Sequence, residues 1–128
     1  MVNTLSGTII FLHIPKTGGT SLQPILLRKF SKDEVLINAH KLMKDVAKWP
    51  EDEKRKLRYL QGHFIFGAHQ ALPQNCEYIT MLRDPVDRVL SHYFFLKRNA
   101  RHPLHKVLVE KKMEIGRHTS ELQSRGHL

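Results

Sequence analysis

The sequence has very little cysteine and no long apolar run. Cys76 is the only cysteine among 128 residues, which excludes an intramolecular disulfide and disfavours a thiolate metal site. The longest apolar run, residues 8–14, has about a third of the roughly 20 residues that a membrane span needs, and its flanks do not resemble a signal peptide. We therefore expect no metal, no membrane span and a reducing, cytoplasmic setting.

Acidic residues are also scarce relative to basic ones. Twelve Asp and Glu stand against 21 Lys and Arg, which gives a formal net charge of +9, with nine His in addition. This surplus favours an anionic partner such as a nucleotide, a nucleic acid, a sulfated glycan or a membrane surface. A nucleic-acid-binding module is the weakest of these readings, because the aromatic residues fall on expected core faces and do not interleave with a basic stripe.

Short apolar strands alternate with helical segments along the chain. Strands are expected over residues 8–13, 35–38 and 78–82, with 62–67 as a strand or a loop; helices are expected from about 20–22 to 30, over 45–59 with a break at 49–50, and over 85–98 and 104–110. This order predicts an α/β layer fold with a mainly parallel sheet, in which ligands bind at the carboxyl ends of strands. We assign residues 1–110 to one domain; residues 111–128 form a polar tail without an apolar pattern that predicts order.

Residues 15–21 (PKTGGTS) connect the first expected strand to the first expected helix and have the composition of an oxyanion-binding loop. Gly18 and Gly19 permit a tight turn with inward N–H groups, Lys16 adds a positive charge, and the helix start adds its dipole. The hydroxyl donors of the loop are Thr17, Thr20 and Ser21. A Walker A loop is excluded, because its lysine follows the last glycine. The alternative is a plain turn with an exposed lysine.

A second group of polar residues lies in the segment 78–98. Arg83 follows an expected strand, and Ser91 lies two turns into the next helix, on the side opposite its apolar face. Arginine can bind two oxygens of a phosphate while serine binds a third, so the pair suits a second phosphate. The alternative is an ion pair of Arg83 or Arg88 with Asp84 or Asp87.

Residues 15–22 (PKTGGTSL) and 82–93 (LRDPVDRVLSHY) together resemble two motifs of the sulfotransferases that use 3′-phosphoadenosine 5′-phosphosulfate (PAPS). The resemblance is to the carbohydrate branch, which includes the heparan sulfate 2-O- and 6-O-sulfotransferases. It implies a three-layer, P-loop-like fold. It also implies that the loop holds the 5′-phosphosulfate through Lys16, Thr17, Gly18, Gly19, Thr20 and Ser21. Arg83 and Ser91 would hold the 3′-phosphate of PAPS and of the product PAP.

Gly62-His63 resembles the Gly-His that carries the general base of the 2-O-sulfotransferases. Histidine suits this role because its ordinary pKa, about 6.5, lets it accept a hydroxyl proton near neutral pH. His69 or a carboxylate is an alternative base. The implied catalytic residues are therefore Lys16, which would neutralise charge on the leaving oxygen, and His63.

The resemblance covers about residues 8–106 and then fades, apart from a weak likeness at 122–125 (LQSR). We therefore expect a short or truncated sulfotransferase that transfers a sulfuryl group to a hydroxyl, with a carbohydrate as the favoured acceptor. The alternative is a remnant that binds PAPS or PAP without catalysis. Neither the individual acceptor nor the oligomeric state follows from the sequence.

Overall fold

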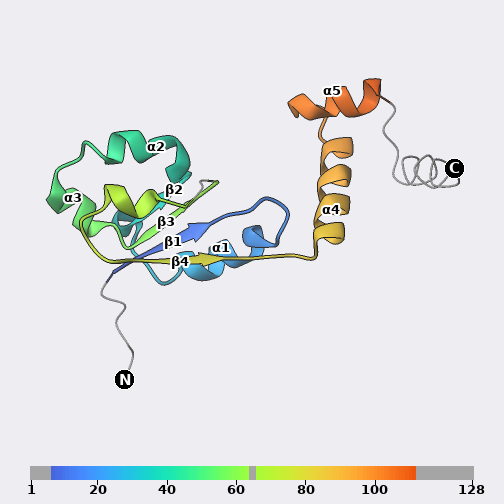
Figure 1. Cartoon of the computed structure of the whole chain (residues 1–128). Helices are drawn as coiled ribbons and strands as arrows, with labels where there is room; N and C mark the ends of the chain where they lie inside the picture. The colour runs from blue at the N-terminus through green and yellow to red at the C-terminus, as the bar shows by residue number, and fades with distance from the viewer. Residues whose placement is uncertain (1–6, 64–65, 112–128) are drawn as a thin grey trace, which may run out of the picture. The chain divides into compact units, whose positions relative to one another are not determined.

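The computed structural model describes residues 7–63 and 66–111 of the chain. The chain divides into two compact units, Met1–Asp84 and Pro85–Leu128 (Figure 1). The predicted tail beyond residue 111, including the segment 122–125, lies outside the described residues, and the assignment of residues 1–110 to one domain stays a prediction.

The first unit contains a four-stranded sheet with helices in its connections. Its strands are β1 (Thr8–Leu12), β2 (Val35–Ile37), β3 (Tyr59–Gly62) and β4 (Cys76–Thr80), and its α-helices are α1 (Gly19–Leu27), α2 (Ala39–Val46) and α3 (Glu51–Lys56). Short 3-10 turns cover Lys32–Glu34 and Ala68–Ala71. The second unit contains α4 (Pro85–Arg98) and α5 (Pro103–Glu110).

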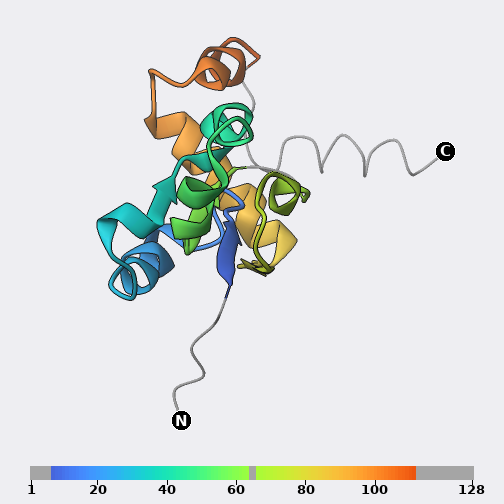
Figure 2. The ribbon, with the colours of Figure 1, turned by 90° about the vertical axis from the view of Figure 1, so that its left-hand side faces the viewer.

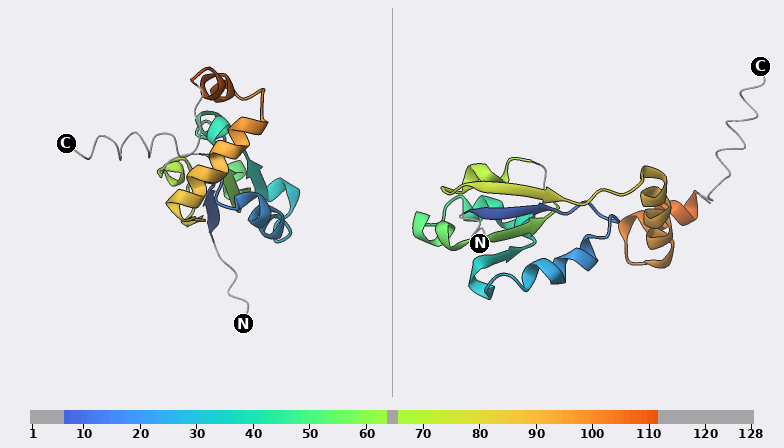
Figure 3. Two further views of the ribbon diagram at one scale, coloured as in Figure 1. Left: turned by 90° about the vertical axis from the view of Figure 1, so that its right-hand side faces the viewer. Right: turned by 90° about the horizontal axis from the view of Figure 1, so that it is seen from below.

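The sheet has the strand order β2-β3-β1-β4, and all of its pairings are parallel. The central strand β1 pairs Leu12 with Gly62 of β3 on one side and with Thr80 of β4 on the other. The carboxyl ends of the strands therefore share one edge (Figure 3). The α/β fold with a parallel sheet, predicted from the sequence, is confirmed.

Helices cover both faces of the sheet, so the first unit has three layers. On one face Ile10 and Leu60 pack with Ala39 and Val46 of α2, and none of these side chains is exposed. On the other face Tyr59 stacks on Phe30, which follows α1, with 5.4 Å between ring centroids. Figures 1 and 2 show α1 and α2 on opposite sides of the strands.

Several expected boundaries are wrong. The strand expected over 78–82 is β4, which covers Cys76–Thr80, and the helix expected to residue 30 ends at Leu27. β3 begins at Tyr59, whereas the sequence predicted a helix through residue 59 and a strand or loop over 62–67; pairing with Ile9 of β1 overrides the helical pattern. The helix expected from residue 45 begins at Ala39 as α2. The helix expected from about 20–22 begins at Gly19 as α1, so Pro24 falls in its second turn and leaves one helical hydrogen bond unmade.

The second unit confirms the predicted helices over 85–98 and 104–110, with each helix beginning at a proline. Leu96 of α4 and Leu108 of α5 are buried, and the Nδ1 atom of His105 hydrogen-bonds the Leu96 carbonyl at 2.7 Å. Over the described ranges 7–63 and 66–111, no helix combines the length and apolarity that crossing a membrane requires.

Candidate functional site

The PKTGGTS loop joins the carboxyl end of β1 to the start of α1. Lys16 and Gly18 both have left-handed backbones, with φ of 66° and 89°. This conformation is costly for lysine, and such strain is often found at ligand-binding loops. Gly18 is the N-cap of α1 and supplies no side-chain cap. The N–H of Ser21 already donates to the Gly18 carbonyl at 3.0 Å, which leaves the N–H groups of Gly19 and Thr20 as the donors at the positive end of α1.

The hydroxyl groups of the loop differ in their surroundings. Thr17 is 5% exposed, and its Oγ1 donates a hydrogen bond to the Ile14 carbonyl at 2.8 Å. The hydroxyl proton of Thr17 is therefore used within the loop. The backbone N–H remains as the group with which Thr17 could donate to a phosphate. Thr20 and Ser21 are exposed in the first turn of α1, and their predicted role as hydroxyl donors stays a prediction.

Arg83 follows β4, the strand next to β1, and contacts the loop. It lies three residues after β4, and its Nη1 atom donates to the Lys16 carbonyl at 3.4 Å, the long end of a hydrogen bond. Two segments 67 residues apart in the sequence, both predicted to bind phosphate, therefore meet at the carboxyl edge of the sheet. The guanidinium adds a second cation beside Lys16.

Ser91, the predicted partner of Arg83, lies in α4 and is half-buried. The loop and Arg83 belong to the first unit, whereas Ser91 belongs to the second. The convergence of Ser91 with Arg83 on one phosphate therefore stays a prediction.

Three histidines gather at the same edge of the sheet. His63 directly follows β3 and is exposed, and its ring stacks on the ring of His13 with 4.7 Å between centroids. The ring of His40, from the first turn of α2, lies 5.5 Å from that of His63. His40 Nδ1 accepts a hydrogen bond from the backbone N–H of His63 at 3.1 Å. His63, the predicted base, is thus held between β1 and α2.

His13 links this cluster to the loop. It follows β1, and its ring packs so closely against Gly19 that a β-carbon at position 19 would overlap it. Burial, and to a lesser extent the charge of a protonated His63, lower the pKa of His13. Glycine at position 19 therefore accommodates the neighbouring imidazole, whereas the left-handed turn falls at Gly18.

The alternative base, His69, has a different environment. The Tyr78 hydroxyl oxygen accepts hydrogen bonds from the N–H groups of Gly67 and His69, at 3.3 and 3.0 Å. The Tyr78 proton is then donated to His69 Nδ1, 2.8 Å away. A neutral His69 carries its own proton on Nε2, so neither ring nitrogen is available as a base. The geometry favours His63 over His69.

Two further features contribute no reactive group to the site. Burial raises the pKa of the Cys76 thiol, which keeps it protonated.

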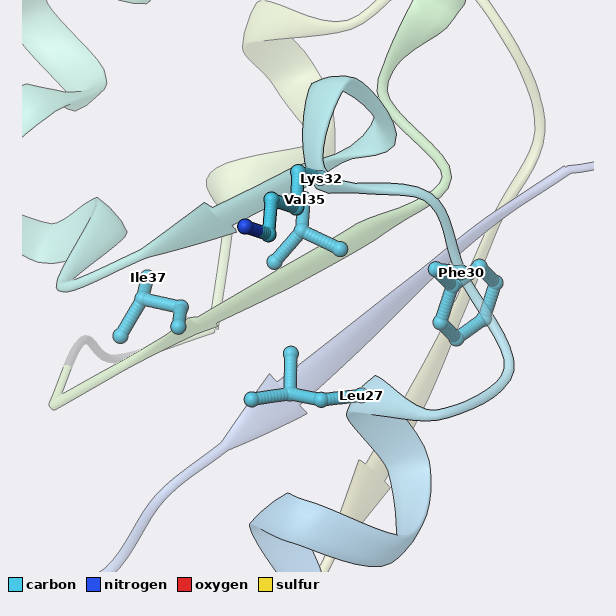
Figure 4. Close-up of a pocket in the computed structure, with 5 residues that line it drawn as sticks. All are labelled: Leu27, Phe30, Lys32, Val35 and Ile37. Carbon is cyan, nitrogen blue, oxygen red and sulfur yellow. The ribbon is translucent and has the colours of Figure 1, made fainter.

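A hollow of about 580 Å³ beside β2 is lined by Leu27, Phe30, Lys32, Val35 and Ile37 (Figure 4). It contains none of the predicted site residues. Within residues 7–63 and 66–111, no three His, Cys, Asp or Glu side chains have a metal-binding arrangement.

Sequence reasoning did not identify His13 or His40 as part of the site. His13 was read only as the end of a strand, and His40 lies in a segment for which no helix was expected. One signal was available for His13, since it lies at the carboxyl end of the strand that leads into the loop.

The half-buried His13 predicts a loss of stability in acid. Its ordinary pKa is 6.5 and is lowered in the folded protein, so the unfolded chain takes up the proton first as the pH falls. The stability that neutral His13 contributes is therefore lost as the pH falls below about 6.5, where the unfolded chain takes up the proton. Urea unfolding at a series of pH values should show a smaller acid loss for His13→Phe than for the parent. An identical pH dependence in the two proteins would contradict the burial of a neutral imidazole.

Comparisons with known proteins agree with the site. A model of the sulfotransferase family matches residues 5–127. Over 95 residues the chain is 36% identical to a protein-tyrosine sulfotransferase of Arabidopsis thaliana, covering 72% of this chain and 18% of that protein. Over 111 residues it is 27% identical to the heparan sulfate 2-O-sulfotransferase hst-2 of Caenorhabditis elegans, covering 73% of this chain and 33% of that protein.

The chain therefore spans a third or less of the length of these two relatives. No solved structure matches it. The family assignment rests on the match over nearly the whole chain, together with the PKTGGTS loop and Arg83 that meet at the edge of the sheet. The chain belongs to the sulfotransferase family.

Proposed function

We propose that the protein transfers a sulfuryl group from PAPS to a hydroxyl group, with a carbohydrate as the acceptor. The observation that carries this proposal is that the PKTGGTS loop, Arg83 and His63 lie at one edge of a parallel sheet. An anion cradle, a second phosphate-binding cation and a base are the three parts that such a transfer needs.

Each phosphate-containing group of the donor is assigned to a set of residues, beginning with the loop. The N–H groups at the start of α1 and the Lys16 ammonium bind the 5′-phosphosulfate, and Arg83 binds the 3′-phosphate together with Ser91. The contact between Arg83 and the Lys16 carbonyl supports this division, because it places the second cation next to the loop without occupying the helix start.

The transfer is an in-line displacement at sulfur. The acceptor oxygen forms a bond to sulfur while the bond from sulfur to the bridging phosphate oxygen breaks, and PAP leaves. His63 accepts the acceptor's proton, and Lys16 neutralises the charge that develops on the bridging oxygen. A metal ion is not required in this scheme, since Lys16 and the N–H groups supply the positive charge.

The carbohydrate acceptor is proposed because the base, His63, belongs to a Gly-His pair like that of the 2-O-sulfotransferases. The relative named as a protein-tyrosine sulfotransferase makes a tyrosine-containing peptide the competing acceptor. An assay of PAP release with a heparan sulfate oligosaccharide and with an acidic tyrosine peptide separates the two. A remnant would bind PAP and transfer to neither acceptor. Exclusion of nucleic acid as a partner and a cytoplasmic location are also parts of the proposal.

Lys16→Ala should lower sulfuryl transfer by at least about 10²-fold, because the lost charge acts mainly on the transition state. Binding of PAPS should weaken as well. Lys29→Ala, which removes an exposed lysine just beyond α1, is the matched control and should keep the parental rate. Steady-state kinetics of PAP release measure both effects, and an unchanged turnover in Lys16→Ala would rule out its catalytic role.

Arg83→Ala and Ser91→Ala should each weaken the binding of PAP much more than that of adenosine 5′-phosphosulfate, which lacks the 3′-phosphate. Isothermal titration with both nucleotides gives the comparison. Arg101→Ala, which removes an exposed arginine elsewhere, should affect neither. Equal losses for the two nucleotides would mean that Arg83 and Ser91 support the fold and not the 3′-phosphate.

His63→Ala should lower transfer by about 10²–10⁴-fold while PAP affinity stays nearly intact, because a base acts on the acceptor and not on the donor. The parental rate should also fall in acid, where a protonated imidazole can no longer accept a proton, and the variant should lack this fall. His69→Ala should keep the parental rate, since its nitrogens are not available as a base. The assignment fails if His63→Ala retains full activity.

A further inference from the structure

We propose that His13 is a positioning residue that holds the His63 imidazole with its proton on Nδ1, so that the Nε2 lone pair is free for the acceptor. This inference rests on the proposed function, because it concerns the same base. His13 lies outside both the PKTGGTS loop and the Gly-His pair, so neither motif assigns it a role.

The first observation is a hydrogen bond that fixes the tautomer. His63 Nδ1 lies 2.6 Å from the backbone carbonyl oxygen of His13. A carbonyl can only accept, so Nδ1 must carry the proton and donate it. In a neutral imidazole the other nitrogen, Nε2, then has the free lone pair. His13 thereby sets which nitrogen of His63 acts as the base.

The second observation is that the backbone of both residues is fixed. The N–H of His13 donates to the carbonyl of Gly62, the last residue of β3, at 3.0 Å, which extends the pairing one residue beyond the end of β1. The N–H of His63 donates to His40 Nδ1. The carbonyl of His13 and the Cα of His63 are therefore held at a defined separation. This separation lets the His63 side chain donate from Nδ1 to the His13 carbonyl.

The third observation is the ring of His13 itself. It stacks on the His63 ring at an interplanar angle of 26° and on the Phe11 ring, at a centroid distance of 5.6 Å. It also packs against Gly19 at the start of α1. A flat ring between Gly19 and His63 limits the rotation of the His63 side chain, so that the hydrogen bond to the carbonyl is kept.

The charge of His13 matters as well as its shape. Among the described residues of the first unit, the rings that face His63 are those of His13, which follows β1, and of His40 in α2. Burial lowers the pKa of His13, which keeps it neutral beside a base that becomes positive on accepting a proton. A neutral ring does not repel that charge, and the His13 carbonyl stabilises the Nδ1–H of the imidazolium.

Long-range ¹H–¹⁵N spectra of the histidine rings in the full 128-residue chain test the tautomer directly. The parent should show His63 with a protonated Nδ1 and an unprotonated Nε2. His13→Leu fills a similar volume but is not flat, and His63 should then shift toward a mixture of tautomers. His13→Phe keeps both the backbone carbonyl and a flat ring that can stack on His63, and should preserve the parental pattern.

Kinetics with PAPS and a heparan sulfate oligosaccharide or a tyrosine peptide add a second readout. His13→Leu should lower kcat by up to about 10²-fold, the cost expected of a misplaced catalytic group, with little change in PAP affinity. His13→Phe should recover most of the rate. His69→Leu, which removes another half-buried imidazole of the first unit, should lose stability without changing the His63 tautomer.

The outcomes separate this inference from the proposed function. Absence of transfer in the parent would overturn the proposed function, while the spectra would still decide whether His13 sets the His63 tautomer. A His63 protonated on Nε2, or an unchanged tautomer and rate in His13→Leu, would overturn the inference. Equal losses of kcat in His13→Phe and His13→Leu would mean that the imidazole of His13 acts chemically, which would also overturn a positioning role.

Discussion

The parallel pairing of β1 with both of its neighbours is the constraint on which the candidate site depends. Parallel strands end at the same edge, so the residues that follow β1, β3 and β4 are brought together whatever their separation in the sequence. His13, His63 and Arg83 each follow one of these three strands. A single register shift would separate Leu12 from Gly62 and move His63 away from the His13 carbonyl.

The loop after β1 adds a second requirement, which is close approach of the backbone. Lys16 and Gly18 adopt left-handed conformations, and Gly19 leaves no room for a side chain next to the His13 ring. The two glycines therefore serve different purposes. Gly18 permits the turn that exposes the start of α1, whereas Gly19 lets α1 begin directly beside the His13 ring.

The sequence predicted those elements whose boundaries are determined by residues close together in the chain. The apolar run of β1, the glycine turn and the Asp-Pro start of α4 all gave nearly correct boundaries, because strand burial, backbone freedom and helix capping act within a few residues. The start of β3 was missed, since Tyr59 becomes a strand residue only by pairing with Ile9 of β1. The site divides in the same way. Lys16 and His63 were predicted from sequence motifs, whereas the contacts of His13 were missed because they depend on the pairing of β1 with β3.

Electrostatics connect the two halves of the proposed reaction. Lys16 and Arg83 bring two permanent cations to one edge of the sheet, which favours a nucleotide with several negative charges but disfavours a base that must become positive nearby. The neutral His13 ring lies between the loop glycine and His63 and adds no further charge. Its carbonyl instead presents a negative partial charge to the proton on His63 Nδ1. In the proposed scheme His13 therefore contacts both halves of the site: its ring packs against Gly19 and stacks on His63, and its carbonyl accepts the hydrogen bond from His63 Nδ1.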